Sequence, residues 1–281
     1  MNWACPKCRL PLQEFSSYYK CENNHTFDIA KQGYSNLLLA NQKSSKNPGD
    51  NDKMLMARSS FLEGNYFKPL QDEIVQLFKF YLSENGISKG TILDCGCGEG
   101  HYLRVLSNSL GSSFQYKGID IAKKGVKLAA AGAKKDIKIK SDFAVASSAN
   151  IPLSDNSCVA VYSIFSPVKA LEILRILKKQ GCFIRVLPGP NHLYELKEKI
   201  YREARQHDPP KELMGFTLIS EKKLHFDLCF DHGETYQNLI EMTPFAWEAK
   251  LKSNGNSLFT IGDKITADFN IQVMRTTESL L

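Results

Sequence analysis

The chain has 281 residues, 43% of them hydrophobic, and its 36 Lys and Arg against 30 Asp and Glu give a formal net charge of +6. This length supports one or two domains with a sizeable core and no need for staples. The longest apolar runs fall well short of the ~20 residues that cross a bilayer, and the start of the chain lacks an export-signal pattern. We therefore expect a cytoplasmic protein without a membrane segment, whose eight cysteines serve metal binding, catalysis or packing rather than disulfides.

Residues 1–36 are rich in cysteine and aromatic residues but show no apolar period, which is typical of a small unit that needs a staple. They contain a C-x2-C pair, twelve intervening residues and then C-x3-H, formed by Cys5, Cys8, Cys21 and His25. This spacing predicts a closed structural zinc site with three thiolates and one imidazole, leaving no open position for hydrolytic chemistry. The alternative is a set of unligated thiols. Nearby lysines and aromatic residues fit either an RNA-binding surface or a solvated basic face.

A polar stretch over 41–53 reads as a linker or an ordered surface loop, and helical spacing follows over 54–82. Beyond it, β-rich runs alternate with helical ones, which predicts a mostly parallel sheet with helices on both faces. The tail, with strands over 216–230 and 268–274 around a helix near 234–241, predicts an antiparallel sheet edge. The other strands are expected at 91–95, 115–121, 137–145, 158–165 and 182–187, and the other helices at 101–110, 123–133, 168–179 and 192–205.

Glycines 96, 98 and 100 follow the first of these strands, where an open α/β sheet binds its cofactor. The spacing is G-x-G-x-G, unlike the G-x-G-x-x-G of dinucleotide enzymes, and no phosphate-binding Lys follows. Asp94 precedes the loop, and Asp120 ends the next strand, where an acidic side chain accepts ribose hydroxyls. Acidic side chains suit the cationic sulfonium and amine of S-adenosylmethionine, so we expect this cofactor. Cys95 and Cys97 are interpreted as packing residues.

Several short motifs resemble the bacterial large-subunit (23S) ribosomal RNA guanine-N1 methyltransferases, and the likeness covers nearly the whole chain. They are Cys5-Pro-x-Cys8, His25 with Phe27-Asp28-x-Ala30-Lys31-x-Gly33-Tyr34-x-Asn36-Leu37-Leu38, Pro48-Gly49-Asp50, Ala57-Arg58-x-x-Phe61-Leu62, Pro69-Leu70, Leu93-Asp94-x-Gly96-Cys97-Gly98-Glu99-Gly100, Pro188-Gly189-Pro190-x-His192-Leu193 and Met242-Thr243-Pro244-Phe245-Ala246-Trp247. The resemblance implies a zinc-binding rRNA-recognition module (1–36), a linker and helical segment (37–82) and a class I, Rossmann-like methyltransferase domain (83–281).

The same resemblance implies methyl transfer from S-adenosylmethionine to N1 of one guanine in a 23S rRNA hairpin, and a homodimer. Family cofactor contacts fall at Gly98, Glu99, Ile119 and His192. A further contact falls at Phe67, where the family usually has tyrosine, so a hydroxyl is lost there unless Tyr66 replaces it. With the residues argued above, the expected cofactor set is Phe67, Asp94, Gly96, Gly98, Glu99, Gly100, Ile119, Asp120 and His192.

Guanine N1 bears a proton, so a base must remove it or donors must stabilise charge on O6. The base is not assigned: His192 is a candidate by its motif, against a role as a cofactor contact or core residue. Phe165, Phe245 and Trp247 are candidates for packing against the target guanine. Adenine amino methylation is disfavoured because 165–168 reads Phe-Ser-Pro-Val, and cytosine C5 methylation because the chain has no Pro-Cys turn. Two alternatives remain, a small-molecule methyltransferase with a structural zinc knob and a non-enzymatic RNA-binding assembly protein.

Overall fold

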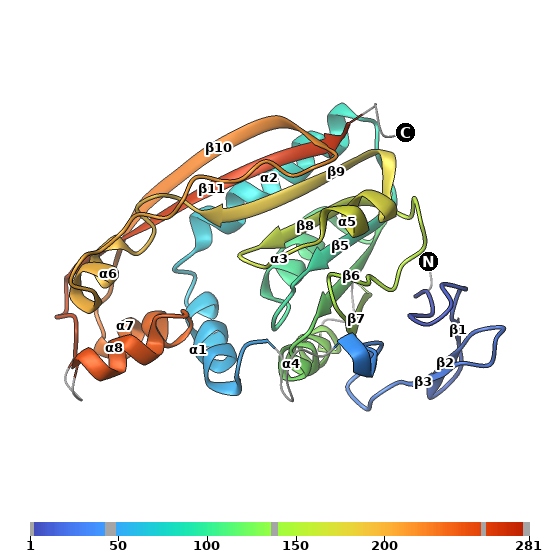
Figure 1. The fold of residues 1–281 in the computed structure, drawn as a ribbon, viewed down its shortest axis with the longest axis horizontal. Coiled ribbons are helices and arrows are strands. Elements are labelled where there is room, and N and C mark those ends of the chain that lie inside the picture. Colours follow the sequence, from blue (N-terminus) through green and yellow to red (C-terminus); the bar gives the residue numbers. More distant parts are fainter. Residues whose placement is uncertain (1–2, 43–48, 136–139, 254–256, 278–281) are drawn as a thin grey trace.

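The computed structural model describes residues 3–42, 49–135, 140–253 and 257–277 (Figure 1). Within these residues, eight strands form one sheet in the order β10-β11-β9-β8-β5-β6-β7-β4. They are β4 (Tyr34–Asn36), β5 (Gly90–Cys95), β6 (Phe114–Asp120), β7 (Ser141–Val145), β8 (Cys158–Ile164), β9 (Leu177–Pro188), β10 (Phe216–Cys229) and β11 (Lys264–Thr276). Neighbours from β4 to β9 are parallel, whereas β11 runs antiparallel to β9 and β10. The predicted parallel sheet with an antiparallel edge is confirmed.

The helices depart from the sequence prediction in four places, the first being a break at residues 64–67 in the helical segment expected over 54–82. They are α1 (Asp52–Glu63), α2 (Lys68–Glu84), α3 (His101–Leu110), α4 (Lys123–Ala133), α5 (Ala170–Ile176), α6 (Tyr194–Ile200), α7 (Gly233–Glu241) and α8 (Ala246–Ser253). The helix predicted over 168–179 is too long because β9 begins at Leu177. The one over 192–205 is also too long, because Tyr201 adopts an extended backbone conformation that ends α6 at Ile200. The sequence did not predict α8. In the described part of the chain, no helix is long and apolar enough to span a bilayer.

The two faces of the sheet are covered differently. The core on one face contains residues of α2, α3 and α4, whereas the core on the other contains residues of α5 and of the N-terminal module. That module is a three-stranded antiparallel sheet of β1 (Gln13–Glu14), β2 (Tyr18–Lys20) and β3 (Thr26–Asp28). It lies beside β6 and β7, far from α7 and α8 in the view of Figure 1. The module thus shares a core with the sheet.

Around the predicted module boundary, β4 joins the larger sheet and the helices α1 and α2 join its core. After β3, the chain forms β4, which pairs in parallel with β7, and then the short 3-10 helix η1 (Ala40–Gln42). Both α1 and α2 contribute residues to the main core. The division at residues 36 and 82 stays a prediction. Residues 43–48 of the expected linker and 137–139 of the expected strand over 137–145 lie outside the described residues.

Candidate active site and metal centre

The four predicted zinc ligands come together in the N-terminal module, with their ligand atoms within 4.8 Å of one another. The Cys8 and Cys21 sulfurs are 3.7 Å apart, and His25 Nδ1 lies 3.5 Å from the sulfurs of both Cys5 and Cys21. A tetrahedron built on Zn–S and Zn–N bonds of about 2.3 and 2.0 Å has edges of about 3.8 and 3.5 Å. The residues therefore fit one zinc ion, and all four positions are filled by protein.

The thiols of this cluster differ in acidity. A hydrogen bond from the Leu10 backbone lowers the pKa of Cys8 to about 6, whereas burial raises the pKa of Cys5 to about 11. A bound cation would draw the Cys5 thiol into its thiolate form.

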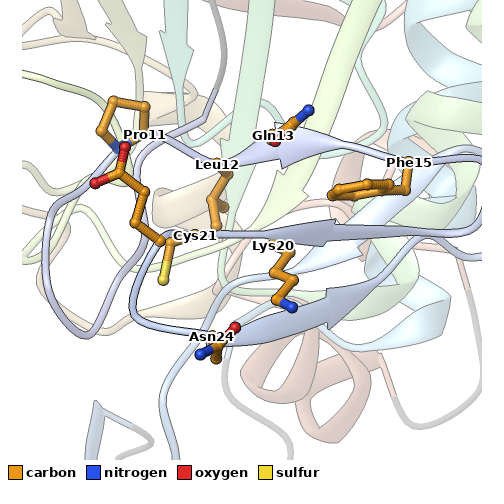
Figure 2. Close-up of a pocket in the computed structure, with 8 residues that line it drawn as sticks. Pro11, Leu12, Gln13, Phe15, Lys20, Cys21 and Asn24 are labelled. Atoms are coloured by element: carbon orange, nitrogen blue, oxygen red, sulfur yellow. The ribbon is translucent and has the colours of Figure 1, made fainter.

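Beside the cluster, a shallow pocket of about 340 Å³ is lined by Leu12, Phe15, Lys20 and Asn24, among others (Figure 2).

The glycine-rich turn runs from β5 into α3, next to the end of β6. The Asp120 carboxylate accepts hydrogen bonds from the N–H groups of Gly98 (2.9 Å) and Ala122 (2.7 Å) and so ties this turn to the start of α4. Asp94, only 3% exposed, accepts a hydrogen bond of 2.8 Å from the Tyr162 hydroxyl. Burial raises the pKa of Asp94 to about 8 and also raises the pKa values of Glu99 and Asp120.

These residues line a cavity of about 880 Å³, which is within the range of about 300–1,000 Å³ typical of cofactor sites. Every residue of the expected cofactor set lines it except Gly100. Gly100 has φ +81°, and a Cβ there would lie 2.8 Å from the Cβ of Ala129, so this glycine lets α3 and α4 approach. The Tyr66 hydroxyl points to Thr235 (3.4 Å), and Tyr66 is not part of the cavity wall, so it does not replace the hydroxyl absent at Phe67.

The wall of the cavity fits a cationic cofactor. Glu99 is paired with Arg104 at 3.3 Å, but among the described residues no ion pair involves Asp94 or Asp120. The Nε2 atom of His101, which also lines the cavity, is buried without a partner in the same part of the chain. Unpaired carboxyl groups and an unsatisfied imidazole leave places for the cationic and polar groups of S-adenosylmethionine.

The cavity is also lined by Phe165, His192, His207 and residues 242–245. The Asp268 N–H donates to His192 Nδ1 (3.2 Å), and burial lowers the pKa of His192 to about 3. His192 is then a neutral donor through Nε2, which does not fit the base role considered from the sequence. Trp247 lies outside the cavity wall and is 68% exposed. His207 had no motif to mark it and was missed.

The fold and this cavity define an S-adenosylmethionine-dependent methyltransferase with a zinc ribbon. Family models match residues 3–46 ("RlmA, N-terminal") and 87–244 ("Methyltransferase domain"). A Bacillus subtilis protein named "Putative 23S rRNA (guanine-N(1)-)-methyltransferase YxjB" is 32% identical, covering 88% of this chain and 87% of its own. A Streptomyces fradiae protein named 23S rRNA (guanine(748)-N(1))-methyltransferase is 28% identical, covering 86% and 85%. The solved structure of MccD protein matches with a TM-score of 0.46 and 20% identity over 71% of this chain and 95% of its own. The chain belongs to the RlmA-type 23S rRNA (guanine-N1)-methyltransferase family.

Proposed function

We propose that this enzyme methylates N1 of one specific guanine in a hairpin of 23S rRNA. Family membership supports the chemistry, and the observation that carries the proposal is one cavity whose wall brings together carboxyl, aromatic and imidazole side chains. Bound S-adenosylmethionine supplies an electrophilic methyl group. The protein's task is chiefly to hold the guanine and this methyl group in line, since alignment accounts for much of the barrier reduction in such displacements.

In this proposal the cofactor is held by Phe67, Asp94, Gly96, Gly98, Glu99, Ile119, Asp120 and His192, all of which line the cavity. Asp120 keeps acceptor capacity for ribose hydroxyls, because a carboxylate can accept about four hydrogen bonds and two are used. Asp94 and Glu99 face the cationic part of the cofactor. The guanine enters unpaired, because its N1 is inaccessible in a duplex.

The surface between the zinc module and the cavity suits an RNA backbone. Residues 121–140 contain seven lysines and one aspartate, and Lys123 and Lys127 are exposed on α4. Lys134, just after α4, donates to the backbone oxygen of Lys31 in the module (2.7 Å), so this basic surface reaches the module. There, Phe15 stacks on Tyr18 with ring centroids 4.9 Å apart beside Lys20. Aromatic and cationic groups of this kind bind unpaired nucleotides.

We further propose a homodimer whose two zinc modules line one RNA cleft, as the family resemblance implies, working in the cytoplasm, where 23S rRNA is found. Sedimentation of the purified protein with and without an rRNA hairpin would test the dimer. A monomer in both samples would remove it.

The reaction is tested by incubating the protein with labelled S-adenosylmethionine and unmodified 23S rRNA, followed by primer extension. A methyl group at N1 blocks base pairing, so reverse transcriptase should stop at one guanine. Label transfer without a stop would overturn the N1 assignment. Absence of transfer to RNA would favour a small-molecule substrate or a non-enzymatic role.

A further inference from the structure

In the turn after β8, Phe165 lines the cavity with a backbone conformation that is unfavourable for its residue type. Phe165 has φ +53°, a conformation that bulky residues rarely adopt. Its N–H donates to the Val186 carbonyl (3.0 Å), and the Ser163 hydroxyl closes the turn by donating to the Ser166 carbonyl (2.9 Å). The ring stays 42% exposed although it lines the cavity. Strain that the surrounding structure maintains in this way is typical of functional positions.

A second feature of the same wall is an imidazole brought back by the irregular segment after α6. The His207 N–H donates to the Pro190 carbonyl (3.0 Å), and the Gln206 amide donates to Asn191 Oδ1 (2.8 Å). These bonds place His207 beside His192, with ring centroids 6.3 Å apart. Both rings line the cavity, and the Phe165 and His192 rings are 5.2 Å apart.

The two nitrogens of His207 have different surroundings. Its Nε2 is buried and has no partner among the described residues. The ring also has a hydrogen bond with the His192 backbone that favours the charged imidazole, so the backbone group is the carbonyl oxygen and the ring is the donor. Because Nε2 has no partner, the donor is Nδ1–H. In the neutral ring this leaves an unprotonated lone pair on Nε2.

Burial lowers the pKa of His207, so the ring is neutral near pH 7. Lys197 on α6 lowers this pKa further, whereas Asp208 and Asp268 oppose the shift. His192, the nearest imidazole, is itself neutral because burial lowers its pKa to about 3. The neighbouring groups thus leave the His207 ring, which lines the cavity, uncharged.

We propose that Phe165 and His207 form the subsite for the target guanine, with the Phe165 ring stacking on the base and His207 Nε2 accepting the N1 proton. This inference depends on the proposed guanine-N1 activity. The N1–H bond breaks and its proton moves to Nε2, giving an imidazolium. The N1 electron pair forms the new bond to the methyl carbon, and the carbon–sulfur bond breaks with its electrons going to sulfur. The products are N1-methylguanine and S-adenosylhomocysteine, and the imidazolium later returns its proton to water.

The kinetic test compares His207→Gln with wild type in single-turnover methylation of the rRNA hairpin across pH 5 to 9. General-base catalysis is worth about 10²–10⁴-fold, so the variant should be at least about 100-fold slower. The wild-type rate should rise with pH through the lowered pKa of His207 and then level off, whereas the variant should lack this rise and plateau. His225→Gln, at an exposed position on β10, is the matched control and should keep the wild-type rate. A His207→Gln rate within threefold of wild type, with the same pH profile, would overturn the assignment.

A measurement without turnover completes the test. Nitrogen NMR of the imidazole in the whole protein should show a proton on Nδ1 of His207 and a lone pair on Nε2; a proton on Nε2 at pH 7 would overturn the base role.

The stacking role of Phe165 is tested separately. Phe165→Leu should weaken RNA-dependent methylation at least tenfold while calorimetry shows unchanged affinity for S-adenosylmethionine, and Phe165→Tyr should keep the wild-type rate. An unchanged rate in Phe165→Leu would remove the stacking role. If the wild-type protein gives no N1 stop on RNA, the proposed function fails instead.

Discussion

The ammonium group of Lys117 on β6 lies 4.2 Å from the centroid of the Trp3 ring in the zinc module. This contact joins a central strand of the large sheet to the module. Both side chains are 1% exposed, and Lys117 also pairs with Asp142 on β7 at 3.0 Å. Arg9 of the module donates to the Ile151 carbonyl at 2.9 Å. A buried cation over an aromatic face, backed by an ion pair, fixes the module to the sheet.

This contact predicts that the zinc module and the methyltransferase sheet unfold together. Trp3→Ala should lower the free energy of unfolding by about 3–5 kcal/mol, since it opens a cavity in a shared core and uncovers Lys117. Denaturant unfolding followed by circular dichroism would measure the loss. Trp247→Ala, at an exposed position on α8, is the matched control and should change stability by less than about 0.5 kcal/mol. A main transition that Trp3→Ala leaves unmoved would show that the module is independent of the sheet.

Loss of one zinc ligand should separate RNA binding from cofactor binding. Cys8→Ser leaves three ligands, so the metal content should fall well below one zinc per chain and affinity for the rRNA hairpin should drop at least tenfold. Affinity for S-adenosylmethionine should remain, because none of the four ligands is in the cavity wall. Metal analysis, filter binding and calorimetry give the three readings. Cys229→Ser, at an exposed cysteine outside the cluster, should match wild type in all of them. Unchanged RNA affinity in Cys8→Ser would remove the module from recognition.

Site residues that lie a few positions apart in the sequence, or at the ends of neighbouring strands, could be predicted from the sequence. The zinc ligands are such a case, because two short turns set the positions of all four side chains. The glycine-rich turn and Asp120 are another, because parallel neighbouring strands end at the same edge of the sheet.

Lys117 and His207 could not be predicted, because each depends on a distant segment. A lysine in a β-strand is normally assigned to the solvent side, and only docking of the module buries this one. His207 follows the helix expected over 192–205, which ends at Ile200, and its position depends on hydrogen bonds that His207 and Gln206 make to residues 190 and 191. Apolar periodicity carries no information on such a return of the chain.

Two glycines with positive φ should respond differently to alanine. Gly100 (φ +81°) lies against Ala129, whereas a Cβ at Gly86 (φ +62°), in the turn that ends α2, would meet nothing within 4 Å. Both substitutions carry a left-handed backbone penalty of about 1 kcal/mol, but only Gly100→Ala must also push α4 from α3. Thermal unfolding should show Gly100→Ala to be less stable than Gly86→Ala by at least about 1 kcal/mol. Equal losses would mean that α3 and α4 move apart at no cost in free energy.

Asp120 should contribute to cofactor affinity in two ways, by accepting ribose hydroxyls and by holding the glycine-rich turn through Gly98. Hydrogen bonds to charged groups are worth about 1.5–3 kcal/mol, so Asp120→Ala should weaken S-adenosylmethionine binding by at least tenfold. Calorimetry would measure this loss, and zinc content should stay at the wild-type level. Asp72→Ala, at an exposed carboxylate on α2 outside the cavity wall, should bind the cofactor normally. Full affinity in Asp120→Ala would refute the ribose assignment.

Asp94 predicts how stability and cofactor binding change with pH. Its pKa is raised to about 8 in the folded protein by burial, against about 4 in an unfolded chain. The stability that this group contributes is therefore complete below pH 4 and is lost as the pH rises toward 8, because only the unfolded chain releases the proton in that range. Asp94→Asn keeps the acceptor for Tyr162 and cannot ionise, so its stability relative to wild type should improve from pH 4 to pH 8.

A cationic cofactor next to this carboxyl group favours its charged form and lowers its pKa. Binding of S-adenosylmethionine at pH 7 should consequently release a proton, and affinity should rise with pH until about 8, where the unliganded group is already ionised. Calorimetry in phosphate and in Tris, which differ in ionisation enthalpy, would count the protons released. Asp94→Asn should bind more weakly and show a smaller dependence on the buffer. A binding enthalpy for wild type that is identical in both buffers would show that Asp94 does not ionise when the cofactor binds.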